Sequence, residues 1–477
     1  MARICFVQNI SYEYLGVMSL SSMLKSDGHE TQVFLERGQG IERLVREVMR
    51  ADPTAVAFSC TTGVHRWCLR AAEEFKKSAP DLLTVFGGAH PTFFPDIVEE
   101  PQVDIVCRGE GEEALLELAE RIDQKSSFSD IRNLWVKAEG RIIQNDVRPL
   151  IENLDRLPFP DRGLYVKRYP FLNRTQKLFM MGRGCPFSCA YCFNHAFKKL
   201  YENKGTFLRL RSAENIIAEI REVKARSRIK TVYFQDDTFG LDKQKTQVFL
   251  EKYSQELRLP FICLLRADLA DEGIVSRLKK AGCCRVFFGI ETGSEKLRNL
   301  VLKKKLTDEQ IIQAAALLKR CQIRFRTYNM FGLPNESLAD ALKTVDLNIR
   351  IKTDYPWSSL FQPFPGTELA QSAKEQGLLQ QEDDFDPSFF KRSILRLPEI
   401  REIENLHRLF FYAVKMPFLL PFIKKAIKCK LGKCYNLLFL IGYLWSYKQS
   451  ERLSLLEVLR VGLSNVKNFI FQGEERP

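Results

Sequence analysis

Short apolar runs separated by stretches of helical length recur along about the first third of the chain, and this alternation limits the possible folds strongly. The runs lie at residues 4–7, 32–35, 55–58, 82–86 and 104–107. Each run is almost continuously apolar, which is typical of strands buried on both faces of a parallel sheet. The stretches between them are long enough for the helices that such a sheet needs on its two faces. The pattern therefore predicts an α/β fold that begins with a doubly wound, Rossmann-like parallel sheet.

The same alternation resumes in the middle of the chain. Strand-like runs lie at 178–181, 231–234, 261–265, 286–290, 325–331 and 358–361. Helical patterns separate them at about 212–226, 241–257, 271–281, 307–320 and 337–351. The sequence thus predicts six βα-type repeats, too few to close a barrel of eight parallel strands. Residues that directly follow each strand are site candidates, because active sites in such barrels lie at the carboxyl ends of the strands.

Three cysteines lie close together in the run Cys185-Pro-Phe-Ser-Cys189-Ala-Tyr-Cys192. They occupy the loop between a predicted strand and the next predicted helix. Three thiolates at this spacing can ligate three irons of a 4Fe–4S cluster and leave the fourth iron without a protein ligand. A structural zinc site is the alternative, but it needs four ligands. No fourth cysteine follows at a suitable spacing, so His195 would have to complete that site.

The cysteine spacing, with Tyr191 before the last cysteine, resembles the signature of the radical S-adenosylmethionine (radical SAM) superfamily. The resemblance implies a central partial (βα)6 barrel of the TIM type, with SAM bound at the open iron. It implies that the cluster ligands are Cys185, Cys189 and Cys192. Residues after the predicted strands also resemble pieces of this group, and we expect SAM contacts from Tyr191, Asp236, Arg266 and Glu291.

The side-chain chemistry of these expected SAM contacts differs. Arg266 suits the SAM carboxylate, because a guanidinium can bind a carboxylate through two parallel hydrogen bonds. Glu291 can accept hydrogen bonds from the ribose hydroxyls. For Asp236 a second interpretation stays open, since an aspartate that follows a strand often caps the next helix or turn.

The first predicted domain resembles the cobalamin (B12)-binding domain that precedes many radical SAM enzymes. The resemblance rests on Val85-Phe-Gly-Gly-Ala-His-Pro-Thr92 and Asp104-Ile-Val-Cys-Arg-Gly-Glu-Gly111. It implies cobalamin contacts from loops that follow three of the strands, namely from Ser59, Thr61, Gly87, Gly88, Arg108, Gly109 and Glu110. The chain departs from the familiar module in one respect, because the loop after its first strand contains no histidine to ligate cobalt. Either cobalamin binds without a histidine on its lower face or the domain no longer binds it, and the remaining loops favour binding.

Pattern and resemblance together divide the chain into four parts. We expect a cobalamin-binding Rossmann-like domain at 1–148, a linker at 149–176, the radical SAM partial barrel at 177–385 and a helical C-terminal domain at 386–477. A predicted hairpin at 134–137 and 141–144 closes the first domain. The segment after it contains Pro158 and Pro160 and few periodic positions, as is typical of a linker.

The last part of the chain is aromatic and aliphatic, with lysines interspersed. No run reaches the roughly 18 uninterrupted apolar residues of a spanning helix, so we expect no transmembrane segment. Two interpretations stay open: a helical cap on the barrel, or a face at 404–450 that rests on anionic lipid. The scattered thiols and the lack of a recognisable signal segment predict a cytoplasmic protein, either free or peripheral at the inner membrane face. The net charge of +13 is not accompanied by a basic stripe with aromatics or by zinc-finger spacing, so nucleic acid is not expected.

The two resemblances combine into one functional hypothesis. They imply a cobalamin-dependent radical SAM enzyme that uses a 4Fe–4S cluster, SAM and cobalamin. One electron would cleave SAM to a 5′-deoxyadenosyl radical, and the enzyme would methylate an unactivated carbon of a small, apolar substrate. A cyclase or a carbon-skeleton rearrangement enzyme with the same cofactors is the alternative, and a non-catalytic iron–sulfur scaffold is a more distant one. The family also implies a reductant such as flavodoxin or ferredoxin.

Overall fold

In the computed structural model, the described residues are 1–379, 389–451, 453, 454, 456 and 458. They form two compact units. The first unit comprises Met1–Arg174 and Ala196–Phe207, and the second comprises Thr175–His195 and the described residues from Leu208 onward. The domain boundaries expected from the sequence stay predictions. Residues 149–174, expected as a linker, group with the first unit, and the expected border at 385 lies outside the described residues.

The first unit contains a sheet of seven strands in the order β2-β1-β3-β4-β5-β6-β7. Its strands are β1 (Arg3–Gln8), β2 (Glu30–Leu35), β3 (Ala55–Ser59), β4 (Leu83–Gly87), β5 (Ile105–Cys107), β6 (Leu134–Ala138) and β7 (Arg141–Gln144). The first five are parallel, and β6 and β7 form an antiparallel hairpin beside β5. The predicted doubly wound sheet and the predicted hairpin are therefore confirmed.

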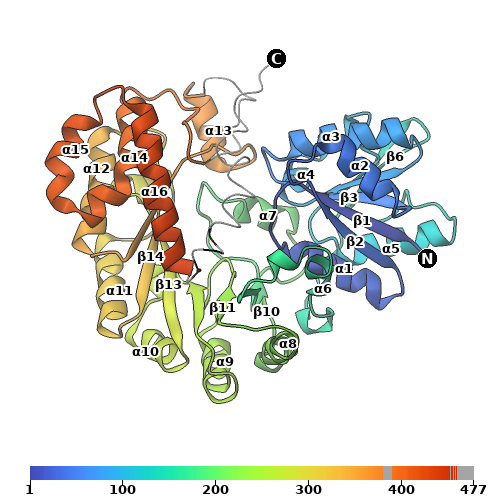
Figure 1. Ribbon diagram of the computed structural model, residues 1–477, viewed down its shortest axis with the longest axis horizontal. Helices are drawn as coiled ribbons and strands as arrows, with labels where there is room; N and C mark the ends of the chain where they lie inside the picture. The colour runs from blue at the N-terminus through green and yellow to red at the C-terminus, as the bar shows by residue number, and fades with distance from the viewer. Residues whose placement is uncertain (380–388, 452, 455, 457, 459–477) are drawn as a thin grey trace. The chain divides into compact units, whose positions relative to one another are not determined.

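Helices cover both faces of this sheet. They are α1 (Leu15–Ser26), α2 (Ile41–Met49), α3 (His65–Ser78), α4 (Ala89–Phe93) and α5 (Glu112–Asp123). Figure 1 shows α2 and α3 on one face and α1 and α5 on the other, and each pair packs on its own apolar core. The strand that follows β1 in sequence, β2, lies on one side of β1, and β3 and the later strands lie on the other side. The order of the strands therefore reverses at β1. Such a switch point opens a crevice at the carboxyl ends of the strands, where ligands bind in doubly wound sheets.

Residues after the hairpin pack on the rest of the first unit through polar contacts, one of which is fully buried. Asp161 accepts hydrogen bonds from Ser21 Oγ at 2.8 Å and from Lys25 Nζ at 2.5 Å, both on α1. Tyr165, on the short helix α6 (Gly163–Val166), donates to Gln8 Oε1 at 2.8 Å. These contacts tie the segment to the first unit.

The second unit is built on six parallel strands in the order β15-β14-β13-β12-β11-β8. They are β8 (Gln176–Phe179), β11 (Thr231–Phe234), β12 (Phe261–Leu264), β13 (Cys283–Glu291), β14 (Arg324–Phe331) and β15 (Tyr355–Leu360). Sequential order and parallel pairing confirm the predicted βα repeats, and β8 and β15 do not pair with each other. The sheet is thus an open, partial barrel.

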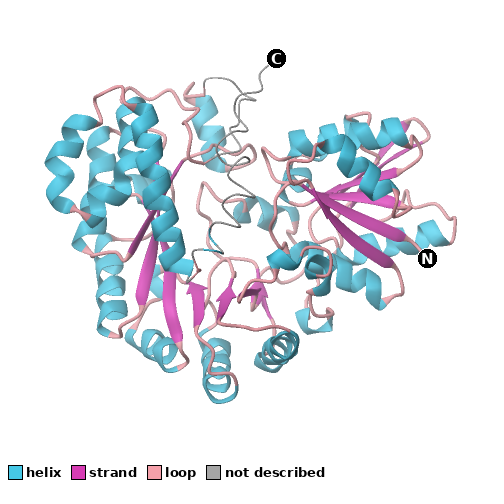
Figure 2. Ribbon diagram, in the orientation of Figure 1, coloured by secondary structure: helices cyan, strands magenta, loops and turns pink. Residues whose placement is uncertain are grey.

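Helices alternate with these strands and cover the outer face of the sheet, as Figure 2 shows. They are α8 (Ala213–Arg226), α9 (Lys243–Glu256), α10 (Glu272–Lys280), α11 (Asp308–Arg320) and α12 (Leu338–Arg350). All five begin at polar caps that the sequence supplies, for example the Thr307–Gln310 capping box of α11. Their apolar faces join the strands in one continuous core.

The described C-terminal residues form helices, as the sequence predicts. They are α14 (Ile400–Lys415), α15 (Leu420–Ala426) and α16 (Gly432–Glu451), whereas α13 (Glu368–Glu375) lies within the range expected for the barrel. An apolar core joins α14 and α15 to α12 and β15. Among the described residues, no helix is long and apolar enough to cross a membrane.

Candidate functional site

The three cysteines of the predicted cluster lie on the loop between β9 (Gly182–Arg183) and α7 (Asn194–Leu200). Cys185 and Cys189 are buried, and Cys192 is partly exposed. The Cys192 amide donates to the Cys189 carbonyl oxygen at 3.0 Å, so a turn brings these two residues together. Burial raises the pKa of Cys185 and raises the pKa of Cys192 to about 11. A thiolate at these positions therefore requires compensating positive charge, which iron would supply when bound.

The donor set fits an iron–sulfur cluster. In the described part of the chain, no three histidine, cysteine, aspartate or glutamate side chains are arranged to hold one metal ion. A cluster does not need that arrangement, because each cysteine ligates a different iron. Arg266 Nη1 lies 3.9 Å from Cys189 Sγ and provides a buried cation beside the thiolates.

The approach to the cysteine loop is held by backbone pairing and by one carboxylate. β9 pairs with β10 (Arg209–Leu210), and a side chain at Gly182 would collide with the backbone of Arg209. Asp236, two residues after the end of β11, accepts from the Met181 and Gly182 amides at 2.9 and 2.8 Å. Burial raises the pKa of Asp236 to about 7. Asp236 thus positions the chain before the cysteines, and its contact with SAM stays a prediction.

Three of the four predicted SAM contacts meet at the carboxyl ends of the strands, together with Lys304. Tyr191 Oη donates to Glu291 Oε1 at 3.0 Å, and Lys304 Nζ lies 2.6 Å from the same oxygen. Arg266 donates to the Lys304 carbonyl oxygen at 2.9 Å. Burial and the neighbouring Glu291 carboxylate raise the pKa of Tyr191 well above its usual range. The structure therefore brings Tyr191, Arg266 and Glu291 into one buried polar cluster.

An irregularity at the end of β13 places Glu291 in this cluster. The register between β13 and β14 shifts between Gly289 and Glu291, and Glu291 has φ +68°. Such a bulge turns a side chain away from the direction that strand alternation would give it. A side chain at Gly289 would collide with the Glu291 carboxylate and with Lys304. The glycine therefore leaves room for the ion pair.

Arg266 is fixed from several sides. Its guanidinium pairs with Asp268 through two contacts of 2.9 Å and lies 3.7 Å from the ring centre of Phe187, on the cysteine loop. In this structure Asp268 already occupies Nε and Nη2, the pair of guanidinium nitrogens that can bind a carboxylate through parallel hydrogen bonds. A SAM carboxylate would meet Arg266 through Nη1, the nitrogen nearest Cys189.

Lys304 is the polar residue of this cluster that the sequence analysis missed. It lies within Lys303-Lys304-Lys305, and such a run usually marks a solvated surface. In the structure Lys303 and Lys305 are exposed, whereas Lys304 is 6% exposed. The one sequence signal that could point to Lys304 is the position of the lysine run, because the run follows the polar stretch that begins at Glu291.

The predicted cobalamin contacts lie on loops at one edge of the first sheet. Ser59 ends β3 and Thr61 follows it, Gly87 ends β4 and Gly88 follows it, and the last three contacts follow β5; these are Arg108, Gly109 and Glu110. Parallel strands bring these loops together at their carboxyl ends, and Thr61 and Gly88 are exposed there. The structure thus gathers the seven residues, and their contact with cobalamin stays a prediction.

Two of these glycines cannot carry a side chain in this conformation. Gly88 has φ +96°, and a Cβ there would lie 2.9 Å from the Cys60 carbonyl oxygen. Gly109 has φ +73°, and a Cβ there would collide with the Tyr201 hydroxyl. Gly88 is exposed, so its backbone is open to close approach by a large ligand, whereas Gly109 leaves room for Tyr201. The edge therefore fits cobalamin.

Two histidines that the sequence analysis did not select stack at the same edge. The rings of His65, at the start of α3, and His90, on α4, lie 3.9 Å apart and nearly parallel. His65 Nδ1 accepts from the Gly63 amide at 3.0 Å, and His90 Nδ1 lies 3.1 Å from Thr62 Oγ1. Burial lowers the pKa of His65 to about 4 and that of His90 to about 3. Both rings are therefore neutral at pH 7.

A segment that follows the cysteine loop supports the Arg108–Gly109–Glu110 loop. Residues Ala196–Phe207 group with the first unit. Tyr201 Oη accepts from the Glu110 amide at 2.8 Å, and the Tyr201 ring packs on Phe197 at 5.0 Å. The Leu150 amide donates to the Lys204 carbonyl oxygen at 2.8 Å. Two segments far apart in sequence, the strand-end loops of the first unit and residues 196–207, thus form or support the predicted cobalamin site.

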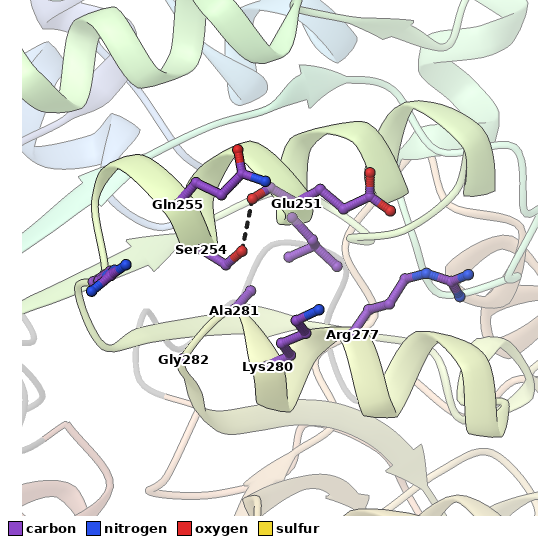
Figure 3. Close-up of a pocket in the computed structure, with 9 residues that line it drawn as sticks. Glu251, Ser254, Gln255, Arg277, Lys280, Ala281 and Gly282 are labelled. Carbon is purple, nitrogen blue, oxygen red and sulfur yellow. Dashed lines mark hydrogen bonds between the residues drawn. The ribbon is translucent and has the colours of Figure 1, made fainter.

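A pocket of about 580 Å³ lies on the second unit, away from these residues. Figure 3 shows its lining, which includes Glu251 and Ser254 on α9 and Arg277 and Lys280 on α10. Ser254 Oγ donates to the Glu251 carbonyl oxygen at 2.7 Å. Gly282 also lines the pocket and directly precedes β13, so the pocket is at the amino ends of the strands. It is therefore at the opposite end of the strands from the polar cluster around Glu291.

Comparison with known families matches both parts of the chain. The radical SAM superfamily matches residues 179–347, and the B12 binding domain matches residues 11–119. The first range contains the cysteine loop and the polar cluster around Glu291. The second contains all seven predicted cobalamin contacts.

Curated relatives match over most of the chain. One is an uncharacterized methyltransferase of Pyrococcus horikoshii, which is 28% identical over 76% of this chain and 79% of its own length. Another is the anaerobic magnesium-protoporphyrin IX monomethyl ester cyclase of Rubrivivax gelatinosus, which is 26% identical over 86% of this chain and 75% of its own length.

A solved structure shares the fold of the whole chain. It is the radical S-adenosylmethionine methyltransferase TsrM of Kitasatospora setae, with tryptophan substrate and a SAM analogue bound. The TM-score is 0.69, with 96% of this chain and 99% of that chain covered. At 16% identity the likeness shows the fold alone.

Proposed function

Because this chain belongs to the cobalamin-dependent radical SAM enzymes, we propose that it transfers a methyl group from SAM to an unactivated carbon of a small, apolar substrate. The observation that carries the proposal is the presence in one chain of both domains, the cysteine-bearing partial barrel and the cobalamin-type sheet. The methyltransferase relative supports methylation as the reaction.

The cofactors supply the chemistry: when bound, a 4Fe–4S cluster delivers one electron that cleaves SAM, and cobalamin carries the methyl group. The protein holds these groups and excludes water. Cys185, Cys189 and Cys192 would hold the cluster, and the seven residues at the first sheet edge would hold the corrinoid. Within the described residues Tyr191 and Lys304 both bond Oε1 of Glu291, which leaves Oε2 for the ribose hydroxyls.

Lys304 supports this role of Glu291 electrostatically. Both side chains are almost completely buried, and the Lys304 ammonium lies 2.6 Å from the Glu291 carboxylate, so the two form a buried ion pair. An ionised carboxylate accepts hydrogen bonds from hydroxyl groups, whereas a protonated one would also donate. The pair therefore fixes Glu291 as an acceptor.

Methylation can be tested before the substrate is known. Transfer of a methyl group from SAM to a corrinoid leaves S-adenosylhomocysteine, whereas reductive cleavage leaves 5′-deoxyadenosine. We expect anaerobically reconstituted protein, with SAM labelled in its methyl group and a low-potential reductant, to form both products. Formation of S-adenosylhomocysteine should require cobalamin, and the label should appear on the corrinoid.

The cyclase alternative keeps one specific support, the magnesium-protoporphyrin cyclase relative. A cyclase would form 5′-deoxyadenosine without cobalamin-dependent S-adenosylhomocysteine. That result would overturn the methylation proposal in favour of a cyclase. Absence of both products would instead favour the iron–sulfur scaffold.

Two further partners belong to the proposal. We propose flavodoxin or ferredoxin as the reductant, because the family implies a low-potential electron donor. Contact between residues 404–450 and the inner membrane face is a separate proposal, and it rests on the exposed side chains described next.

A further inference from the structure

The segment from Met416 to Trp445, which contains α15 and most of α16, carries most of the large apolar side chains that are exposed in the described part of the chain. We define the basic apolar face as the exposed residues between Lys415 and Trp445. Phe418 and Phe422 are 72% and 70% exposed, and Trp445 is 50% exposed. The other exposed apolar members are Met416, Leu431, Leu437, Leu438 and Ile441. Isolated exposed apolar residues are normal, but such a concentration marks an interaction surface.

Three of the exposed apolar residues of α16 lie on one side of that helix. Leu437, Ile441 and Trp445 recur every four residues, which places them on one face. The opposite side is buried at Gly442 and Ser446. A Cβ at Gly442 would lie 2.9 Å from the Phe411 ring on α14, so α16 packs closely on α14 there. Figure 1 shows these two helices side by side. The apolar stripe therefore points away from the helical core.

The charges in this segment are of one sign. Residues 415–450 contain no aspartate or glutamate. Their lysines are Lys415, Lys424, Lys425, Lys428, Lys430, Lys433 and Lys448. Five of these, from Lys424 to Lys433, are exposed in or between α15 and α16. A surface with exposed aromatic side chains, many lysines and no acidic residue is complementary to an anionic, apolar layer.

We propose that the basic apolar face docks the enzyme on an anionic membrane surface. Phe418, Phe422 and Trp445 enter the boundary between headgroups and acyl chains, and the lysines between them contact lipid phosphates. Acidic protein partners match the lysines alone, and an apolar second copy matches the aromatic residues alone. Anionic lipid matches both, and this role is independent of the proposed reaction.

Vesicle binding by the full-length reconstituted enzyme tests the proposal. We expect the enzyme to float with vesicles that contain phosphatidylglycerol and not with vesicles of phosphatidylcholine alone. High salt should release it, because lysine–lipid attraction is screened. Bromine on the acyl chains should quench the fluorescence of Trp445, and the Trp445→Phe variant should lose this part of the quenching. Equal binding to neutral vesicles would overturn the proposal.

Paired variants test whether vesicle binding depends on the basic apolar face or on exposed apolar side chains in general. Phe418→Ser/Phe422→Ser should lower the fraction bound by about tenfold or more, because two exposed phenylalanines no longer enter the lipid. Lys424→Glu/Lys425→Glu should lower it by about tenfold through charge alone. Val248→Ser removes an apolar side chain that is 44% exposed on α9 and should leave binding unchanged. Equal losses in all three variants would overturn the proposal, as would a dimer in solution that the phenylalanine variant dissociates.

Discussion

Lys304 Nζ lies 2.6 Å from Glu291 Oε1, and the two side chains are 6% and 10% exposed. They come from different parts of the chain, the end of β13 and the segment before α11. Tyr191, one residue before the last cysteine of the predicted cluster loop, bonds the same carboxylate oxygen. The ion pair therefore connects the carboxyl ends of the strands to the cysteine loop.

Replacement of Lys304 by methionine should weaken SAM binding and lower the free energy of unfolding by about 3 kcal/mol, because it leaves the buried Glu291 carboxylate without its cation. Equilibrium dialysis with SAM and urea unfolding measure the two effects. Lys305→Met is the matched control, since Lys305 is exposed. Unchanged SAM affinity in Lys304→Met would remove the pair from the proposed SAM site.

Replacement of Cys185, Cys189 or Cys192 by alanine should each abolish the iron–sulfur absorbance and the formation of 5′-deoxyadenosine, because the cluster loses one of three protein ligands. Iron and sulfide analysis after anaerobic reconstitution measures the loss. Cys429→Ala, at an exposed cysteine on the basic apolar face, should keep full iron content. Normal iron content in any of the three variants would contradict the assigned ligand set.

Replacement of Gly109 by alanine should lower the affinity for cobalamin, because the new side chain would displace Tyr201 or the Arg108–Gly109–Glu110 loop. Titration of the corrinoid absorbance measures the effect. Gly140→Ala is a close control, since Gly140 has the same φ of +73° but no atom within 4 Å of the added Cβ. Both variants should lose about 1 kcal/mol of stability from backbone strain, and only Gly109→Ala should lose cobalamin.

Acid should destabilise the protein through histidines that are neutral when folded. Burial lowers the pKa of His65 to about 4, and it lowers the pKa of His90 and of His407 to about 3. In the unfolded chain histidine titrates near pH 6.5 and binds the additional proton. The free energy of unfolding contributed by these groups is therefore complete above pH 6.5 and falls as the pH drops toward 4. Urea unfolding at pH 7 and pH 5 should show a smaller difference for His90→Gln than for the unchanged protein, and an equal difference would contradict the assignment.

Much of the fold follows from the sequence because buried parallel strands require continuous apolar runs. The expected runs at 55–58 and 231–234 correspond to β3 and β11, and the helix boundaries follow from local capping residues such as Thr307. The cysteine motif could be recognised for a similar reason, since its ligands are close together in the chain. A site whose residues are neighbours in sequence can be recognised without knowledge of the fold.

Features of the site that depend on tertiary contacts could not be predicted from the sequence. Lys304 and Lys305 are identical in sequence, and only the fold buries one of them against Glu291. For Asp236 the sequence leaves SAM contact and a capping role open, and only the fold shows that it accepts two backbone amides before the cysteine loop. His65 and His90 stack because α3 and α4 begin at neighbouring loops, which their separation along the chain does not reveal.

The path of the chain through residues 196–207 limits how this protein can be divided. A truncation at Arg174 would produce a fragment without Tyr201, and the Glu110 amide would lose its acceptor. The complementary fragment would carry Phe197 and Phe207 without Leu150, on which their cluster packs. No single cut in the polypeptide separates the two units, because residues 196–207 belong to the first unit but lie within the sequence of the second. Separate expression of the first unit would therefore require residues 196–207 to be attached to it.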